Sequence, residues 1–331
     1  MTNFDDELAA LLALDALESD EQADAELQLG TFPSDLAATS AALAELTAAQ
    51  PPRELRADAL ANALSRRTAG RPVDAPEPCE PAEGFRRTVA DLHALLISLS
   101  DADWNAQAHP EHGTVRELMS HLVGVERLSA RWLDPDDDVP LLLDHVESTR
   151  DVVDALHDAD PHEIARQWHE AVLAVIDAAA SGDPDRPVVF HDLTSSIPGF
   201  LITRTFELWA HSMDIAEATG RELPVLDPER MAALSSRLMA AVPLALAYRR
   251  STVPGRTVRF VLTGESGGAY TVPLHPGNQS GEPDVLVVAD TIDLCRVAAR
   301  RLAPDDLDVA IEGDADLASL VLAGLDAFAR D

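Results

Sequence analysis

The spacing of apolar residues changes once along this 331-residue chain, and that change most constrains its fold. Between residues 85 and 250 apolar positions recur at helical spacing, over long segments joined by modest loops. Long apolar stripes of this kind suit an up-down helical bundle. After residue 250, short β-rich runs separated by glycine, proline and asparagine turns alternate with helical segments. We therefore expect a mainly α, multidomain protein with a bundle over 85–250 and an α+β domain over 251–331.

Residues 1–67 show a different helical pattern, made of four short segments with few aromatic residues. Such a unit has a thin core, so we expect it to complete its burial against a partner. Through residue 60 the chain carries 13 acidic and 2 basic residues, a net charge of −11. Residues 68–84 follow, rich in proline, glycine and glutamate, and predict a semi-extended linker.

The composition restricts the classes of function. The net charge is −33, and every one of the 25 basic residues is arginine. This acidity opposes direct binding of nucleic acid, whose phosphates would be repelled, but it is compatible with a basic protein surface or simply with solubility. No apolar run reaches the roughly 18 residues of a membrane span, and the first residues do not form a secretion signal. We expect a cytoplasmic protein that does not enter a membrane.

The segment 206–214, FELWAHSMD, carries the strongest chemical signal. Glu207 and His211 are four residues apart, so on a helix they lie on one face, one turn apart, where a carboxylate and an imidazole can bind one metal ion. Arg204 and Asp214 stand three residues to either side and are placed to orient the pair through hydrogen bonds. Taken alone, the pair is more typical of the surface of an amphipathic helix, so a metal site needs a third ligand from elsewhere.

A third metal ligand is available in an earlier helical segment. His121 shares its flank with Leu118, Leu122 and Val125, which predicts that it points into the bundle. A buried, hydrogen-bonded histidine of the core is the simpler interpretation. Together with Glu207, however, the two histidines form a set of three ligands that leaves a tetrahedral zinc ion one open position, as in catalytic sites.

The remaining histidines carry weaker signals. His109 and His112 flank a Pro-Glu loop before the His121 helix, where they would line the mouth of a cleft or face solvent. His162 and His169 are seven residues apart on one predicted helix and suit its surface.

The two segments that carry His121 and the Glu207/His211 pair, TVRELMSHLVGVERLSARWL and RTFELWAHSMDIAEATG, resemble the mycothiol-dependent maleylpyruvate isomerase family. That family is a branch of the DinB-like metal-binding helical bundles. The resemblance implies a divalent metal, zinc by preference, on His121, Glu207 and His211. It also implies mycothiol as a thiol cosubstrate.

The C-terminal phrase VAIEGDADLASLVLAGLDAF resembles the sterol-carrier-type domain that follows the bundle in the same family. There the domain covers one side of the active cleft. No catalytic motif carries over to this chain, although Arg296, Arg300 or Arg301 could meet an anionic substrate.

The resemblance implies an enzyme, either an isomerase or a thiol S-transferase. Binding to the metal would lower the pKa of the thiol, and the resulting thiolate would attack a small electrophilic molecule. No catalytic residue is assigned beyond the metal ligands and their orienting neighbours.

The first fifth of the chain supports a second hypothesis. Its segments LALDALESDEQADAELQL and PSDLAATSAALAELTAAQPPRELRADAL resemble the N-terminal domain of anti-sigma factors, in the branch that lacks the His-x-x-x-Cys-x-x-Cys zinc motif. The resemblance implies that residues 1–67 bind an extracytoplasmic-function sigma factor. In this alternative the protein is a soluble transcription regulator, and its metal bundle serves as a sensor or scaffold.

Overall fold

The computed structural model of the chain describes residues 76–328, with gaps at 135–144, 191–192 and 279–280. All described residues belong to one unit of the chain, Leu60–Asp331. The predicted anti-sigma-like domain, 1–67, and most of the predicted linker, 68–84, lie outside the described residues. Sigma-factor binding therefore stays a prediction.

The described chain begins with helices and ends with an α+β region. The main helices are α5 (Pro81–Ile97), α6 (Val115–Leu133), α7 (His145–Leu156), α8 (Pro161–Ser181), α9 (Ile197–Ala218), α10 (Pro228–Tyr248), α11 (Thr291–Ala298) and α12 (Ala315–Gly324). The strands are β1 (Gln107–His109), β2 (Gly113–Thr114), β3 (Pro187–Phe190), β4 (Leu193–Ser196), β5 (Thr257–Thr263), β6 (Gly268–Pro273), β7 (Val285–Asp290) and β8 (Val309–Gly313). Three short 3-10 helices are Asp103–Asn105, Pro304–Asp306 and Leu325–Phe328.

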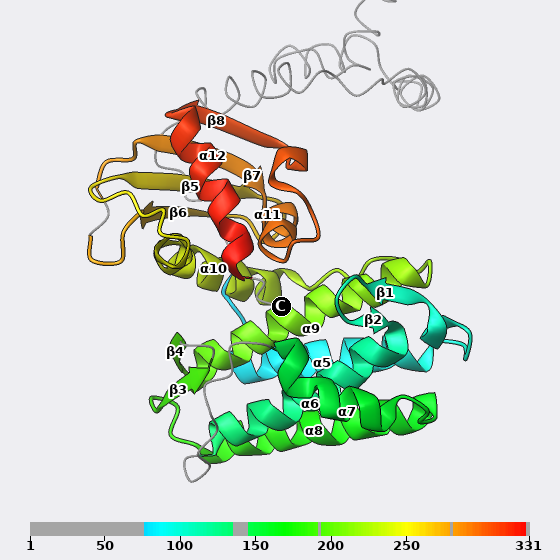
Figure 1. The fold of residues 1–331 in the computed structure, drawn as a ribbon. Helices are drawn as coiled ribbons and strands as arrows, with labels where there is room; N and C mark the ends of the chain where they lie inside the picture. The colour runs from blue at the N-terminus through cyan, green and yellow to red at the C-terminus, as the bar shows by residue number, and fades with distance from the viewer. Residues whose placement is uncertain (1–75, 135–144, 191–192, 279–280, 329–331) are drawn as a thin grey trace, which may run out of the picture. The chain divides into compact units, whose positions relative to one another are not determined.

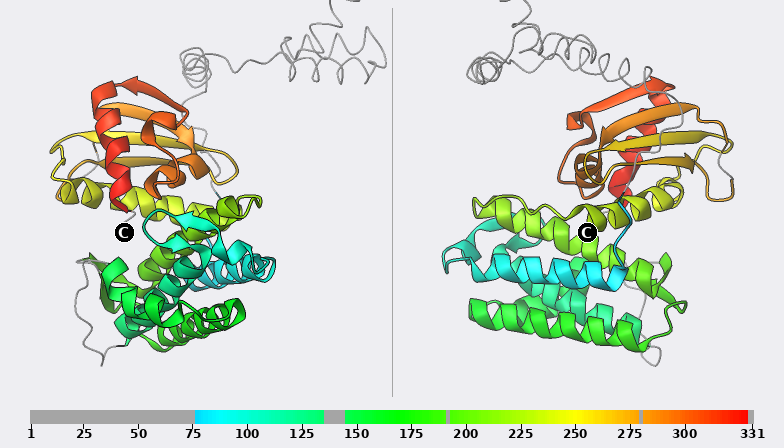
Figure 2. Two further views of the ribbon diagram at one scale, coloured as in Figure 1. Left: turned by 45° about the vertical axis from the view of Figure 1, so that its right-hand side comes forward. Right: turned by 180° about the vertical axis from the view of Figure 1, so that it is seen from behind.

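Four long helices, α5, α6, α8 and α9, run alongside one another as the predicted bundle, with α7 packed on α6 (Figures 1 and 2). Their apolar faces meet in one core, which includes the large buried side chains of Phe85, Trp168 and Phe200. The stripes at helical spacing are therefore the surfaces on which these helices pack.

The helix starts follow the capping chemistry of the sequence. Thr114 and Glu117 form a capping box at the start of α6, with each side chain bonded to the other residue's backbone N–H. Asp160 caps α8, whose first residue is Pro161. The first bundle helix differs from the prediction: Glu80 caps α5 and Pro81 opens it, so the helix begins inside the segment expected to be linker.

Two small antiparallel hairpins were not anticipated. Strands β1 and β2 pair just before α6, and β3 pairs with β4 just before α9. Strands of two to four residues are too short to show an alternating pattern in the sequence. The first hairpin is important below because its turn carries His112.

The predicted α+β region contains a four-stranded sheet with strand order β6-β5-β7-β8. Strands β5 and β7 are parallel, whereas the two outer pairs are antiparallel. Alternate residues of β5, namely Val258, Phe260 and Leu262, are fully buried and belong to a core shared with α11 and α12. Helix α12 crosses one face of the sheet (Figure 1).

Helix α10 joins the two regions, because its buried side chains belong to the same core as the sheet and as Trp209 and Met213 of α9. By length and composition alone α10 could cross a membrane, although the sequence contains no uninterrupted apolar run that predicts a span. Its apolar residues are mostly buried inside the protein, as expected for a core helix.

The two cysteines are expected to differ sharply in reactivity. Cys295 is fully buried on α11, and burial raises the pKa of its thiol to about 12, whereas Cys79 is half-buried. At pH 8 only about one in ten thousand Cys295 side chains would be thiolate. A chromogenic disulfide reagent should therefore label only Cys79 in the folded protein, and Cys79→Ser should remove that signal. Equal labelling rates for both thiols without denaturant would contradict the described burial.

Candidate metal centre

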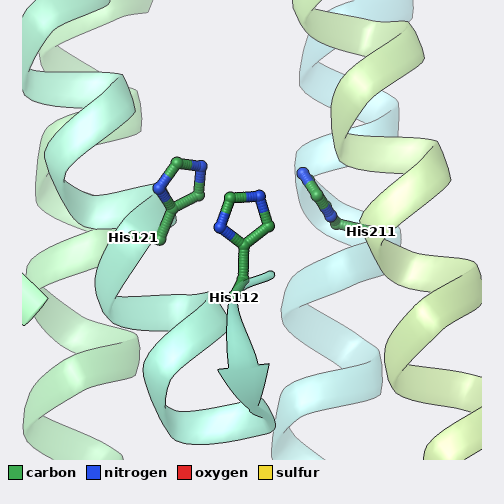
Figure 3. Close-up of side chains that lie close together, drawn as sticks. All are labelled: His112, His121 and His211. Carbon is green, nitrogen blue, oxygen red and sulfur yellow. The ribbon is translucent and has the colours of Figure 1, made fainter. Parts of the chain in front are cut away.

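Three buried histidines converge inside the bundle. His112, His121 and His211 each present a ring nitrogen, and these nitrogens all lie within 4.8 Å of one another. The rings come from the β1–β2 turn, from α6 and from α9, and His211 faces the other two across the gap between the helices (Figure 3). Among the described residues this is the one group of histidine, cysteine and carboxylate side chains with the spacing of a metal site.

His121 is oriented by the neighbouring helix α7. Its Nδ1 lies 2.7 Å from Thr149 Oγ1, and the Thr149 hydroxyl is also 3.4 Å from the Val146 carbonyl oxygen, to which it donates. The threonine oxygen then accepts from His121 Nδ1–H, which makes Nε2 the nitrogen that would bind a metal. Gly124 allows this contact, since a Cβ there would lie 2.8 Å from Thr149 Cγ2.

His211 is oriented by a carboxylate on its own helix. Its Nδ1 lies 3.0 Å from Asp214 Oδ2, the arrangement in which a carboxylate accepts the Nδ1 proton and directs Nε2 toward a metal. Asp214 is held in turn by Arg301, which donates Nε–H to Oδ1 at 2.9 Å and Nη2–H to Oδ2 at 2.5 Å. Burial alone would raise the pKa of Asp214, but the hydrogen bonds from His211 and Arg301 outweigh it and lower that pKa.

His112 is held by its hairpin and by ring stacking. Its ring stacks on His121 at a centroid distance of 3.9 Å and on His109 at 4.7 Å. It meets His211 edge to face at 5.6 Å. The turn is shaped by His109 Nδ1, which accepts the backbone N–H groups of Glu111 at 3.2 Å and His112 at 3.3 Å.

Gly113, directly after His112, has φ of +77°, and a Cβ there would lie 2.2 Å from Glu117 Oε2. Only glycine fits between this turn and the capping box of α6. The position of His112 is therefore determined by the backbone on both sides of it.

Glu207, the carboxylate expected among the ligands, is engaged with a neighbour on its own helix. It accepts a charge-assisted hydrogen bond from Arg204 Nη1, and its side chain is 31% exposed. Arg204 is buried and also donates to Oε1 of the fully buried Glu126 at 2.6 Å. Burial would lower the pKa of Arg204, but the two carboxylates raise it above its ordinary value.

The structure therefore places the residues selected from the sequence as follows. His121 and His211 lie in the buried cluster, Asp214 contacts His211, and Arg204 links Glu207 to Glu126. From the sequence, His109 and His112 were expected to line the mouth of a cleft or to face solvent. Instead both side chains are buried, and His112 belongs to the histidine cluster. A loop histidine has no helical periodicity to reveal its direction, so only its nearness to the α6 cap pointed toward the bundle.

The chemistry of this group fits a divalent transition metal. Imidazole nitrogen is a preferred ligand of zinc, copper, nickel and iron. Two of the three rings already have Nδ1 hydrogen-bonded to an oxygen, as metal-bound histidines do. Burial excludes the bulk water that would otherwise compete for the ion.

The bundle also matches a known family in sequence. The model of the mycothiol maleylpyruvate isomerase N-terminal domain matches residues 85–216. This segment extends from α5 to α9 and contains all three histidines. Residues 85–216 belong to that domain family. The family resemblance recognised from the sequence is thereby confirmed for the bundle.

Two crystal structures are similar to this chain, those of the mycothiol-dependent maleylpyruvate isomerase and of a mutant of it. They are 16% and 15% identical in sequence, and each has a TM-score of 0.49. The likeness covers 69% of this chain and 90% of each of those chains. A search of curated proteins found no match.

Proposed function

We propose that the protein is a divalent-metal-dependent and thiol-dependent isomerase or S-transferase, with mycothiol as its thiol and a small electrophile as its substrate. His121, His211 and Glu207 would hold the metal, with zinc as the first candidate. The observation that carries the proposal is the convergence of buried histidines in a bundle of the mycothiol maleylpyruvate isomerase N-terminal family. Glu207 supports it because it stands one turn before His211 on α9.

A bound divalent ion would lower the pKa of a coordinated thiol enough to give thiolate at neutral pH. The protein's own groups prepare the site for that chemistry. Thr149 and Asp214 hold the two imidazoles in one tautomer, so binding an ion requires little reordering. Glu126 remains as a buried partner of Arg204 if Glu207 turns toward the ion.

Arg301 lies beside the histidines and would be the contact for an anionic substrate. Its Nη2 lies 3.5 Å from His211 Nδ1, so its positive charge stands beside the histidines. Maleylpyruvate appears in the name of the enzyme whose crystal structures are similar. It is a small dicarboxylate with a conjugated double bond that a thiolate can attack. The guanidinium already pairs with Asp214, so a substrate carboxylate would share it with that residue while facing a chain of net charge −33.

The test is a turnover assay on the full-length, zinc-loaded protein, because isomerisation regenerates the thiol and only S-transfer consumes it. Mycothiol is mixed with maleylpyruvate in one series and with a conjugated enone in another, and both isomerisation and adduct formation are followed. We expect turnover that requires the metal and is lost in His211→Ala. Equal rates with and without metal, or no reaction of the metal-loaded protein with either electrophile, would reject the proposed activity.

A further inference from the structure

The turn between β1 and β2 brings a histidine to the metal centre that the expected ligand set of His121, Glu207 and His211 does not include. We propose that His112 is itself a direct ligand of the metal, so that the bound ion has three imidazole ligands. This inference rests on the metal site of the proposed function and adds one donor to it. The observation behind it is that His112 belongs to the group of ring nitrogens within 4.8 Å of one another.

The ring of His112 is buried between two other histidines. It stacks on His121 at 3.9 Å, with an angle of 22° between the ring planes, and on His109 at 4.7 Å. A histidine of a surface turn would ordinarily extend into water. Here the turn directs the ring inward, to the side of His121 that faces His211 (Figure 3).

The backbone fixes this inward position without help from an ion. His109 Nδ1 accepts the N–H of His112, Gly113 follows with positive φ, and Thr114 is locked in the α6 capping box. These three features of the chain together direct one imidazole at the cluster. Preorganisation of this kind lowers the cost of adding a ligand, because little side-chain and loop entropy is lost on binding.

An additional imidazole changes what the site can do. Two histidines and one carboxylate leave a tetrahedral ion one open position, whereas a fourth protein donor fills it. With His112 bound, an incoming thiol has to replace a protein ligand or enlarge the coordination shell.

The experiment counts imidazole ligands and measures metal affinity in the full-length protein. X-ray absorption at the zinc edge, on wild-type protein with one equivalent of zinc, is expected to show three imidazoles. Titration of metal-free protein with Co²⁺ is expected to show His112→Ala binding at least about 10-fold more weakly than wild type, with a changed visible spectrum, since removing even an outer partner of a ligand costs 10–100-fold. His157→Ala is the matched control, because its side chain is 69% exposed.

Two imidazoles in the wild-type spectrum, or wild-type Co²⁺ affinity and spectrum in His112→Ala, would overturn the inference. Because the X-ray absorption measurement uses wild-type protein, it tests the role of His112 even if His112→Ala does not fold. Failure of the proposed function has another signature: wild-type protein that binds no metal, or His211→Ala that binds it unchanged. If His211→Ala loses the metal while His112→Ala keeps it, the metal site stands and only the role of His112 fails.

Discussion

His211→Ala is expected to reduce metal binding from about one equivalent per chain to a trace. His211 contributes a ring nitrogen to the cluster. Asp214 orients its ring directly, and Arg301 holds Asp214 in place. Loss of an outer hydrogen-bond partner already weakens metal binding 10–100-fold, so loss of the ligand should cost more than about 100-fold. Elemental analysis of untagged protein after dialysis measures the stoichiometry, and competition with a chromogenic chelator gives the affinity.

His157→Ala controls for the general effect of removing a histidine, because His157 is exposed and lies outside the cluster. The control should retain about one equivalent of metal and the wild-type unfolding midpoint. If His211→Ala is folded and still binds one equivalent with wild-type affinity, the ion is held elsewhere in the chain and the candidate site is wrong.

Arg204→Ala is expected to lower the free energy of unfolding by about 3–5 kcal/mol, the typical cost of removing one partner of a buried ion pair. Arg204 is buried between two carboxylates, and the substitution leaves Glu126 fully buried without its partner at 2.6 Å. Equilibrium unfolding in urea, monitored by circular dichroism on metal-free protein, measures the change. Metal-free protein is used so that altered metal binding does not contribute to the difference.

Arg166→Ala is the matched control, because Arg166 also pairs with two glutamates but on the exposed surface of α8. Exposed pairs of this kind are worth about 0–1 kcal/mol. A loss in Arg204→Ala no larger than in Arg166→Ala would show that the buried pair contributes little to stability.

The loss of unfolding free energy caused by Arg204→Ala should also increase as the pH rises from 5 to 8. Burial raises the pKa of Glu126, and without Arg204 nothing in the pair opposes that effect. Above the ordinary carboxyl range, the native variant therefore holds more protons on Glu126 than the unfolded chain does. Stability therefore falls with rising pH, because the unfolded state binds fewer protons.

The sequence predicted the helices and the larger strands because their signals are periodic or local. A Thr followed three residues later by a Glu is a local helix-start pattern, and Thr114 with Glu117 begins α6 in this way. The β-rich runs after residue 250 are β5, β6, β7 and β8. The prediction was least successful where elements are short. The hairpins β1–β2 and β3–β4 have strands of two to four residues, and their pairing depends on the helices around them rather than on an alternating pattern.

The candidate site could be predicted only in part, for a related reason. His121 and His211 lie on long helices, whose apolar faces indicate which side chains point inward. His112 lies in a turn, where direction depends on tertiary contacts such as the hydrogen bonds accepted by His109. The pairing of Arg204 with Glu126 joins residues 78 positions apart, which no local spacing reveals. Direct participation of Glu207 in metal binding stays a prediction.

The contact of Arg301 with Asp214 has a consequence for thermodynamic coupling. Arg301 follows α11 in the sheet region, yet its guanidinium donates hydrogen bonds to Asp214, the carboxylate that orients His211 in the bundle. If the Arg301–Asp214 contact stabilises the geometry that binds an ion, then a bound ion must stabilise that contact by the same free energy. Loading the bundle with metal would therefore raise the protection of α11 and the Arg301 backbone against hydrogen exchange, although neither touches the ion.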